Sequence, residues 1–167
     1  MKKTLTLISL LVVSLLILLP AGHATVPKTV SGTVNYTFEV TEMRVADGNT
    51  FLYAMEWEDW EGDFEGQAEA FFRVEMFSSG FWNVWLRTTF EGDVKIDGTV
   101  KSGTIVIQLV GKKPEGQDWY GQWVIISGEG ELADLHGQGT WGGPGYRSDI
   151  KIPEDPDLWY EGEIHFN

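Results

Sequence analysis

Apolar and polar residues alternate with a period of two through most of the chain beyond residue 30. The clearest stretch is 68–76, where Ala, Phe, Val and Met occupy every second position and charged residues occupy most of the others. Such alternation is typical of a β-strand with one buried face, because successive side chains of a strand point to opposite sides. The stretch 82–90 continues the pattern after Ser78-Ser79-Gly80, so we expect these two segments to form a β-hairpin.

The same alternation predicts strands before and after this hairpin. The apolar residues change parity between Val40 and Met43, which predicts a β-bulge near Thr41 and Glu42. The other expected strands are 51–57, 94–100, 105–109, 119–126, 131–141 and 158–166, and in the first of them Phe51, Tyr53, Met55 and Trp57 share one parity. Eight or nine short strands with glycine-rich turns and no helical periodicity indicate an all-β barrel or sandwich.

The first 24 residues have the pattern of a secretory signal peptide. A basic start, Lys2-Lys3, precedes an uncharged apolar run over 5–19, and the small residues Gly22-His23-Ala24 predict cleavage after Ala24. We therefore expect a secreted or extracytoplasmic protein, with 25–30 as a linker and 31–167 as a single domain. A retained N-terminal anchor is the alternative, although the run is short for a membrane span, which needs about 20 residues.

Composition narrows the classes of partner. The chain has a formal net charge of -13, and removal of the signal takes away two lysines and no acid, which moves the charge to -15. Such a surface repels phosphate groups, so we expect no binding to nucleic acid. No cysteine is present to form disulfides, while 8 Trp, 9 Phe and 5 Tyr supply large side chains for a packed core.

Residues 128–133 have the glycine spacing of a dinucleotide-binding loop. That loop needs a helix directly after it, because the helix N-terminus holds the pyrophosphate. Here Gly137, Gly139, Gly142 and Gly143 follow and deny a helix the length it needs. We therefore expect a tight connection between two strands and no cofactor.

The same region carries a resemblance to a known family. Ser127-Gly128-Glu129-Gly130-Glu131-Leu132-Ala133, followed by Leu135-x-Gly137-x-Gly139, resembles the signature of an uncharacterised bacterial domain family with an allene oxide cyclase-like barrel. The flanking Trp119-x-Gly121-x-Trp123 and Tyr160-x-Gly162-x-Ile164-His165-Phe166 are similar to that family's neighbouring strands. The resemblance implies an antiparallel, eight-stranded closed barrel of the calycin-like kind. It implies no activity, and no catalytic residue of the plant cyclases matches a position here.

Two sets of residues are weak candidates for chemistry. His136 shares a parity with Asp134, but a relay to Ser127 lacks a nucleophile elbow, and His165 is expected on a solvated strand edge. In the acidic run 56–69, Asp59, Glu61 and Asp63 begin like a calcium loop, yet Phe64 and Ala70 replace its glycine and its final glutamate. A solvated strand or hairpin tip is the favoured interpretation, so no catalytic and no metal residue is assigned.

Aromatic side chains are the main candidates for binding. Tyr36, Phe38, Phe72, Trp82 and Trp123 are expected either to line a cavity for a small hydrophobic or amphipathic molecule or to fill the barrel themselves. An eight-stranded barrel is only just wide enough for its own side chains, so the pattern leaves both alternatives open. The loop 142–157 is long enough to cover a barrel mouth.

Other functions remain alternatives to ligand binding. An isomerase or cyclase of the same barrel type needs an ionisable side chain inside the cavity, and Arg73 or Glu39 would have to point inward to supply it. Exposed Trp57, Trp60 and Trp159 would suit a carbohydrate- or protein-binding surface. An outer-membrane barrel is disfavoured, because the strands lack aromatic girdles and a polar lumen face.

Overall fold

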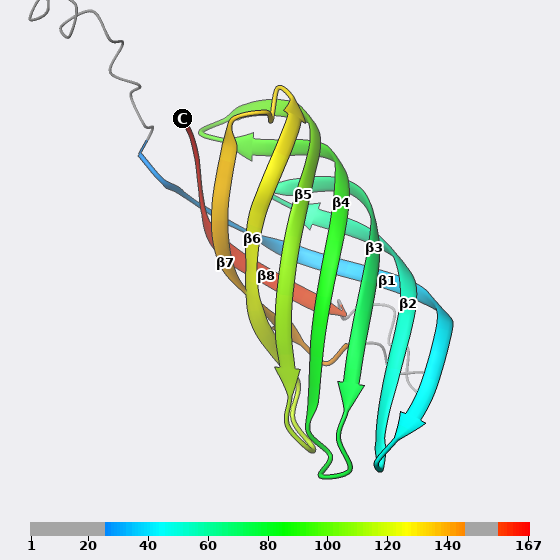
Figure 1. Cartoon of the computed structure of the whole chain (residues 1–167). Coiled ribbons are helices and arrows are strands. Elements are labelled where there is room, and N and C mark those ends of the chain that lie inside the picture. The colour runs from blue at the N-terminus through cyan, green and yellow to red at the C-terminus, as the bar shows by residue number, and fades with distance from the viewer. Residues whose placement is uncertain (1–25, 146–156) are drawn as a thin grey trace, which may run out of the picture.

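The computed structural model describes residues 26–145 and 157–167. Within them, eight antiparallel strands follow one another around a closed barrel, and the last strand pairs with the first (Figure 1). The strands are β1 (Lys28–Ala46), β2 (Asn49–Gly62), β3 (Phe64–Met76), β4 (Trp82–Ile96), β5 (Thr99–Lys113), β6 (Trp119–Gly130), β7 (Leu135–Gly143) and β8 (Leu158–Phe166). The expected eight-stranded antiparallel barrel is confirmed. No helix in the described part of the chain is long and apolar enough to cross a membrane.

Some sequence expectations fall partly or wholly outside these residues. The expected signal peptide, 1–24, lies outside the described residues, and so does 146–156, most of the expected loop 142–157. At the start of the domain, β1 begins at Lys28, within the expected linker 25–30. Residues 28–34 of this strand pair with β8, and residues 32–46 pair with β2. The long first strand therefore closes the barrel by joining both neighbours in turn.

Local sequence signals explain the hairpins and the bulge. Asp47-Gly48 and Asp97-Gly98 each form a two-residue connection in which both residues have positive φ, between 51° and 76°. This backbone suits the right-handed twist of the paired strands and favours Asp-Gly sequences. The β1–β2 register shifts between Val40 and Glu42, so the predicted bulge is confirmed at Thr41.

Buried aromatic rings and leucines form a cluster at the end of the barrel where β2–β3, β4–β5 and β6–β7 turn. There the rings of Phe64 and Tyr160 stack with centroids 5.3 Å apart and planes 14° apart, and Phe90 packs against Phe64 at 5.8 Å. Leu132 and Leu135 of the β6–β7 connection are fully buried against the same cluster. This half of the barrel is filled by its own side chains.

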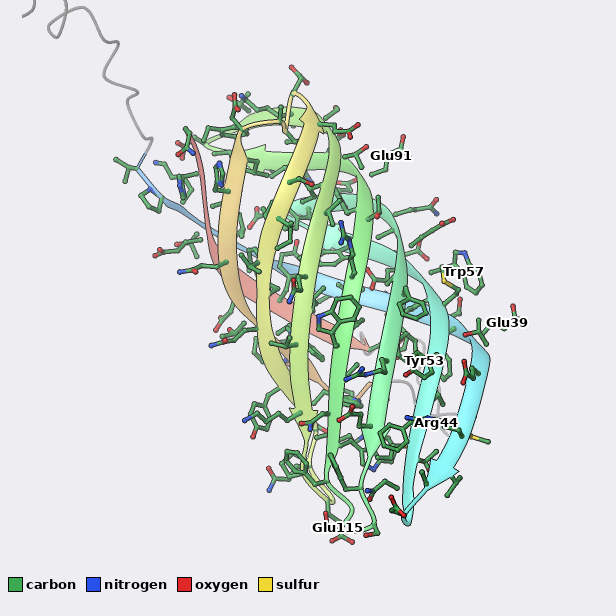
Figure 2. The ribbon with its side chains drawn as sticks, viewed as in Figure 1. Glu39, Arg44, Tyr53, Trp57, Glu91 and Glu115 are labelled. Carbon is green, nitrogen blue, oxygen red and sulfur yellow. The ribbon has the colours of Figure 1, made fainter. Side chains whose placement is uncertain are left out.

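The inward side of β2 differs from what its apolar alternation indicates. Val34 pairs with Trp60, and this register turns Ala54, Glu56, Glu58 and Trp60 inward. Phe51, Tyr53, Met55 and Trp57 lie on the outer side, where Figure 2 shows Tyr53 and Trp57 pointing away from the barrel. Apolar residues occupy both parities of this strand, so the pairing with β1 and β3 decides which parity is buried.

Trp123 lies over a gap that two glycines leave between β7 and β8. Gly139 and Gly162 face each other across these strands, and the Trp123 indole covers both. Its Nε1 donates to the carbonyl oxygens of Thr140 at 3.2 Å and Glu161 at 3.1 Å. A side chain at either glycine would overlap the indole and the opposing backbone, so the inward Trp requires glycine at both positions.

Candidate functional site

A cavity of about 330 Å³ occupies the other end of the barrel, where β1–β2, β3–β4 and β5–β6 turn (the lower end in Figure 1). Its walls are mainly apolar and aromatic, with Glu56 and Lys113 as the charged residue types among them. The lining residues are Tyr36, Phe38, Leu52, Glu56, Phe72, Val74, Met76, Trp82, Val84, Leu86, Lys113, Trp119, Trp141 and Leu158. The barrel is therefore filled in one half and hollow in the other.

The structure brings most of the predicted binding residues to this cavity. Tyr36, Phe38, Phe72 and Trp82 all line it. Phe38 meets Phe72 edge to face with centroids 5.7 Å apart, and Tyr36 lies 6.4 Å from Phe38, so these three rings form one wall. Trp123 is not among the lining residues, because it is buried nearer the filled half, where its ring meets Phe64 at 6.2 Å.

Two acidic residues that were not predicted as part of the site lie inside the barrel. Glu56 and Glu58 of β2 are only 4% and 5% exposed, and Glu56 lines the cavity. The Glu58 carboxylate accepts hydrogen bonds from Trp60 Nε1 at 2.7 Å and from Thr88 Oγ1 at 3.2 Å. Glu56 and Glu58 have the same parity as Ala54 and Trp60, which could have indicated that they face the barrel interior. The acidic run 56–69 around them indicated a solvated segment instead.

Burial changes the acidity of this pair. Desolvation raises the pKa of Glu56 well above its usual value, and the nearby Glu58 and Asp157 raise it further. Burial also raises the pKa of Glu58 to about 7, while its hydrogen bonds with Trp60, Thr88 and Glu56 oppose the rise. The two carboxyls share a hydrogen bond, so they titrate as a pair. Burial thus favours the protonated form of the carboxyl group that lines the cavity.

Indole rings and one lysine form another part of the cavity wall. The centroid of Trp119 lies 6.0 Å from that of Trp82 and 6.4 Å from that of Trp141. Lys113 Nζ lies over Trp82 and Trp119, at 5.6 Å and 5.8 Å from the ring centroids. The ammonium group is held by cation–π contacts at the end of β5, beside the cavity.

The other candidate groups lie away from the cavity. His136 and His165 stack on each other across β7 and β8, with ring centroids 5.6 Å apart. Asp59 lies on β2 and accepts a hydrogen bond from Gln67 Nε2 at 3.1 Å, so it belongs to a hairpin instead of a calcium loop. Among residues 26–145 and 157–167, no group of three or more His, Cys, Asp or Glu is placed to hold a metal ion.

The structure leaves Arg73 and Glu39 outside, as the alternation indicates, and corrects one expectation about an aromatic residue. Arg73 is exposed and donates to Glu75 at 2.8 Å, and Glu39 is also exposed (Figure 2), whereas Glu56 and Glu58 are the buried acids of the described residues. Trp60, expected on the surface, is only 4% exposed, because its parity on β2 is the inward one.

Trp57 and Trp159 do lie on the surface, at 45% and 43% exposure. Trp57 borders a groove of about 570 Å³ on the outer side, together with polar residues such as Asp59, Glu69 and Glu91. Figure 2 shows Trp57 and Glu91 projecting outward from this region. A binding role for these exposed indoles stays a prediction.

Comparison with known proteins gives a likeness of fold. No protein-family model matches the chain, and no curated protein matches it in sequence. Among solved structures, it is similar to the crystal structure of a protein of unknown function from the DUF3224 family of Shewanella oneidensis MR-1. The two share 19% sequence identity with a TM-score of 0.65, over 85% of this chain and 98% of that one. The chain is therefore an eight-stranded antiparallel β-barrel whose fold is similar to that of a DUF3224 protein of unknown function.

Proposed function

We propose that this protein binds a small hydrophobic or amphipathic molecule in the open half of its barrel. The observation that carries the proposal is the cavity of about 330 Å³ with apolar walls and a buried carboxyl group. Ligand sites of this kind are concave and mainly apolar, with a few polar groups that orient the ligand. If each non-hydrogen atom takes about the 30 Å³ of a water molecule in the liquid, the cavity holds about ten such atoms.

The polar end of the cavity supports a ligand more than a packing role. A buried carboxyl costs folding free energy that an apolar side chain of similar size would not, unless it is neutral or hydrogen-bonded. Glu58 is hydrogen-bonded to Trp60 and Thr88, and Glu56 forms part of the cavity wall. The Glu56 carboxyl, whose pKa is raised by burial, offers a ligand a polar group inside an otherwise apolar space.

The test is to fill the cavity and measure binding of 1-naphthylamine, a neutral dye of about eleven non-hydrogen atoms whose fluorescence changes in apolar surroundings. We expect saturable binding by the wild type and at least a tenfold loss in Leu86→Trp, because Leu86 lines the cavity. Val110→Trp adds the same side chain on the outer surface, where Val110 is 42% exposed, and should bind as the wild type does.

A second variant with a smaller added side chain keeps the test valid if Leu86→Trp fails to fold. Val84→Phe fills part of the same cavity with less overpacking and should also weaken dye binding. Equal affinity of folded Val84→Phe, Val110→Trp and wild-type protein would overturn the proposal, as would absence of saturable binding by the wild type.

A second candidate function is proton transfer on the bound molecule, and the position of Glu56 beside the cavity favours it. Because the paired Glu58 has a pKa of about 7, the pair can give or accept a proton at neutral pH. Small cyclic ketones in D₂O would lose the proton signals next to their carbonyl groups faster with wild type than with Glu56→Gln. Equal rates would exclude this chemistry for ketones.

A further inference from the structure

Lys113 differs from the other cavity residues in charge and in contacts. It is the last residue of β5 and pairs with Trp82, the first residue of β4. Its side chain is half-buried, and Nζ lies within 6 Å of the Trp82 and Trp119 ring centroids. Lysine stems pack readily along apolar surface while the ammonium stays close to water. The contacts therefore fix a positive charge at the edge of an apolar cavity.

No described carboxylate neutralises this charge directly. The ion pairs in residues 26–145 and 157–167 join Lys28 to Asp97, Arg73 to Glu75 and Lys95 to Glu65, and none involves Lys113. Of the five lysines in the described residues, Lys28 and Lys95 are ion-paired with an acid, whereas Lys101, Lys112 and Lys113 are not. At Lys113 the neighbours are indole rings, which hold the cation and leave its N–H groups available to an anion.

The remaining walls indicate where the two ends of a ligand would lie. Phe72, Val84 and Leu86 offer only apolar surface to the cavity. Glu56, the other ionisable lining residue, is nearly excluded from solvent and repels an ionised acid less when it carries its proton. An apolar body would therefore enter the cavity, and a negatively charged end would remain beside Lys113.

We infer that the ligand is an amphipathic anion, with its acidic group on the Lys113 ammonium and its apolar part between Phe72, Val84 and Leu86. This inference rests on the proposed function and adds the charge and orientation of the ligand. A charge-assisted hydrogen bond at the edge of the cavity is stronger than one between neutral groups, and it is partly screened by water. This hydrogen bond favours binding of a carboxylic acid over binding of an alcohol with the same chain length.

The experiment compares ligands that differ only in their end group. Octanoate, 1-octanol and octylammonium have chains that match a cavity of about ten non-hydrogen atoms. Each would compete with 1-naphthylamine at pH 7.5 and low salt. We expect octanoate to bind about tenfold more tightly than 1-octanol, which corresponds to about 1.4 kcal/mol, and octylammonium to bind more weakly than either.

Matched variants assign this preference to one side chain. Lys113→Gln should remove the roughly tenfold preference for octanoate over 1-octanol, while Lys113→Arg should keep the preference. Lys112→Gln removes the neighbouring charge, which is exposed and has the opposite parity on β5, and should change neither affinity by more than about twofold.

The outcomes separate this inference from the proposed function. Competition by 1-octanol with no preference for octanoate, or an unchanged preference in Lys113→Gln, would overturn the anionic ligand and leave the binding cavity intact. Tighter binding of octylammonium would also overturn it, since it would identify the carboxyl groups as the charged site. Failure of the dye and all three ligands to bind the wild type would overturn both proposals.

Discussion

The Glu58 carboxylate accepts a hydrogen bond of 2.7 Å from the indole Nε1 of Trp60, two residues further along the same strand. Both side chains are buried inside the barrel, and Thr88 Oγ1 adds a second hydrogen bond from β4. These donors stabilise the charged form of Glu58, but burial has the larger effect and raises its pKa to about 7. The Glu58–Trp60 contact thus links the packed half of the barrel to the acidity of the cavity carboxyls.

Removing the Trp60 donor should destabilise the protein in a pH-dependent way. In Trp60→Phe, charged Glu58 loses its shortest hydrogen bond and its pKa rises further, because this bond lowers the pKa. We expect an additional loss of about 1–3 kcal/mol in the free energy of unfolding at pH 8 relative to pH 5. Urea denaturation of the variant and the wild type at both pH values measures this difference. An equal loss of stability at pH 5 and pH 8 would show that Trp60 contributes by packing alone.

The raised pKa values also predict that folding stability falls as pH rises. The folded protein holds protons on Glu56 and Glu58 at pH values where the unfolded chain has released them. The stabilisation is full below the unfolded pKa of about 4.5 and is lost as pH rises through about 7. For Glu58, the pKa shift from about 4.5 to about 7 corresponds to about 3 kcal/mol in the free energy of unfolding.

Urea denaturation of Glu58→Gln between pH 4.5 and 8 tests this prediction. The variant should lose less stability over the interval than the wild type, by about 2–3 kcal/mol. Glu115→Gln removes an exposed acid, labelled at the lower end of the barrel in Figure 2, and should retain the wild-type slope. Parallel curves for wild type and both variants would contradict a raised Glu58 pKa.

Tyr160 anchors the β2–β3 connection through its hydroxyl. The buried N–H of Phe64 donates to Tyr160 Oη at 2.9 Å, and burial raises the pKa of Tyr160 to about 12. Tyr160→Phe leaves that N–H without its acceptor, so we expect a loss of about 1–3 kcal/mol in the free energy of unfolding. Tyr120→Phe, at a position 48% exposed, should change it by less than about 0.5 kcal/mol. Comparable losses in both would refute the role of the Tyr160 hydroxyl.

Gly139 should tolerate no side chain. A Cβ there would overlap the Glu161 carbonyl oxygen and meet the Trp123 indole. Gly139→Ala should therefore cost about 3 kcal/mol in the free energy of unfolding, because backbone and a buried ring must both shift. Thr140→Ala, at the exposed neighbouring position, should cost less than about 0.5 kcal/mol. Thermal unfolding of the two variants tests this prediction. Near-equal midpoint temperatures would contradict a close approach of the Glu161 backbone and the Trp123 indole to Gly139.

Alternation along the chain was enough to predict much of the fold. The hairpin between 68–76 and 82–90 and the bulge at Thr41 follow from local patterns, because a change of parity or a turn sequence lies within a few residues. Closure between β1 and β8 joins residues more than a hundred positions apart, and only the resemblance to a barrel family anticipated it.

The candidate site was only partly predictable. Tyr36, Phe38, Phe72 and Trp82 lie on inward parities of amphipathic strands, which explains why the alternation placed them at the cavity. Glu56 and Lys113 escaped notice because charged residues normally lie in solvent, and Trp60 was placed outside because its strand has apolar residues on both sides.

The sequence by itself determined most of the strands, the turn at 78–80 and the aromatic residues of one cavity wall, since each depends on periodicity over a short stretch. Two expected strands were wrong in part, because 94–100 contains the Asp97-Gly98 turn and 131–134 belongs to the β6–β7 connection. Only the tertiary structure decided which side of β2 faces inward, which half of the barrel stays hollow and which charges meet there. The physical reason is that these properties depend on register and closure between distant strands. A carboxyl acquires its raised pKa only when those strands remove it from water.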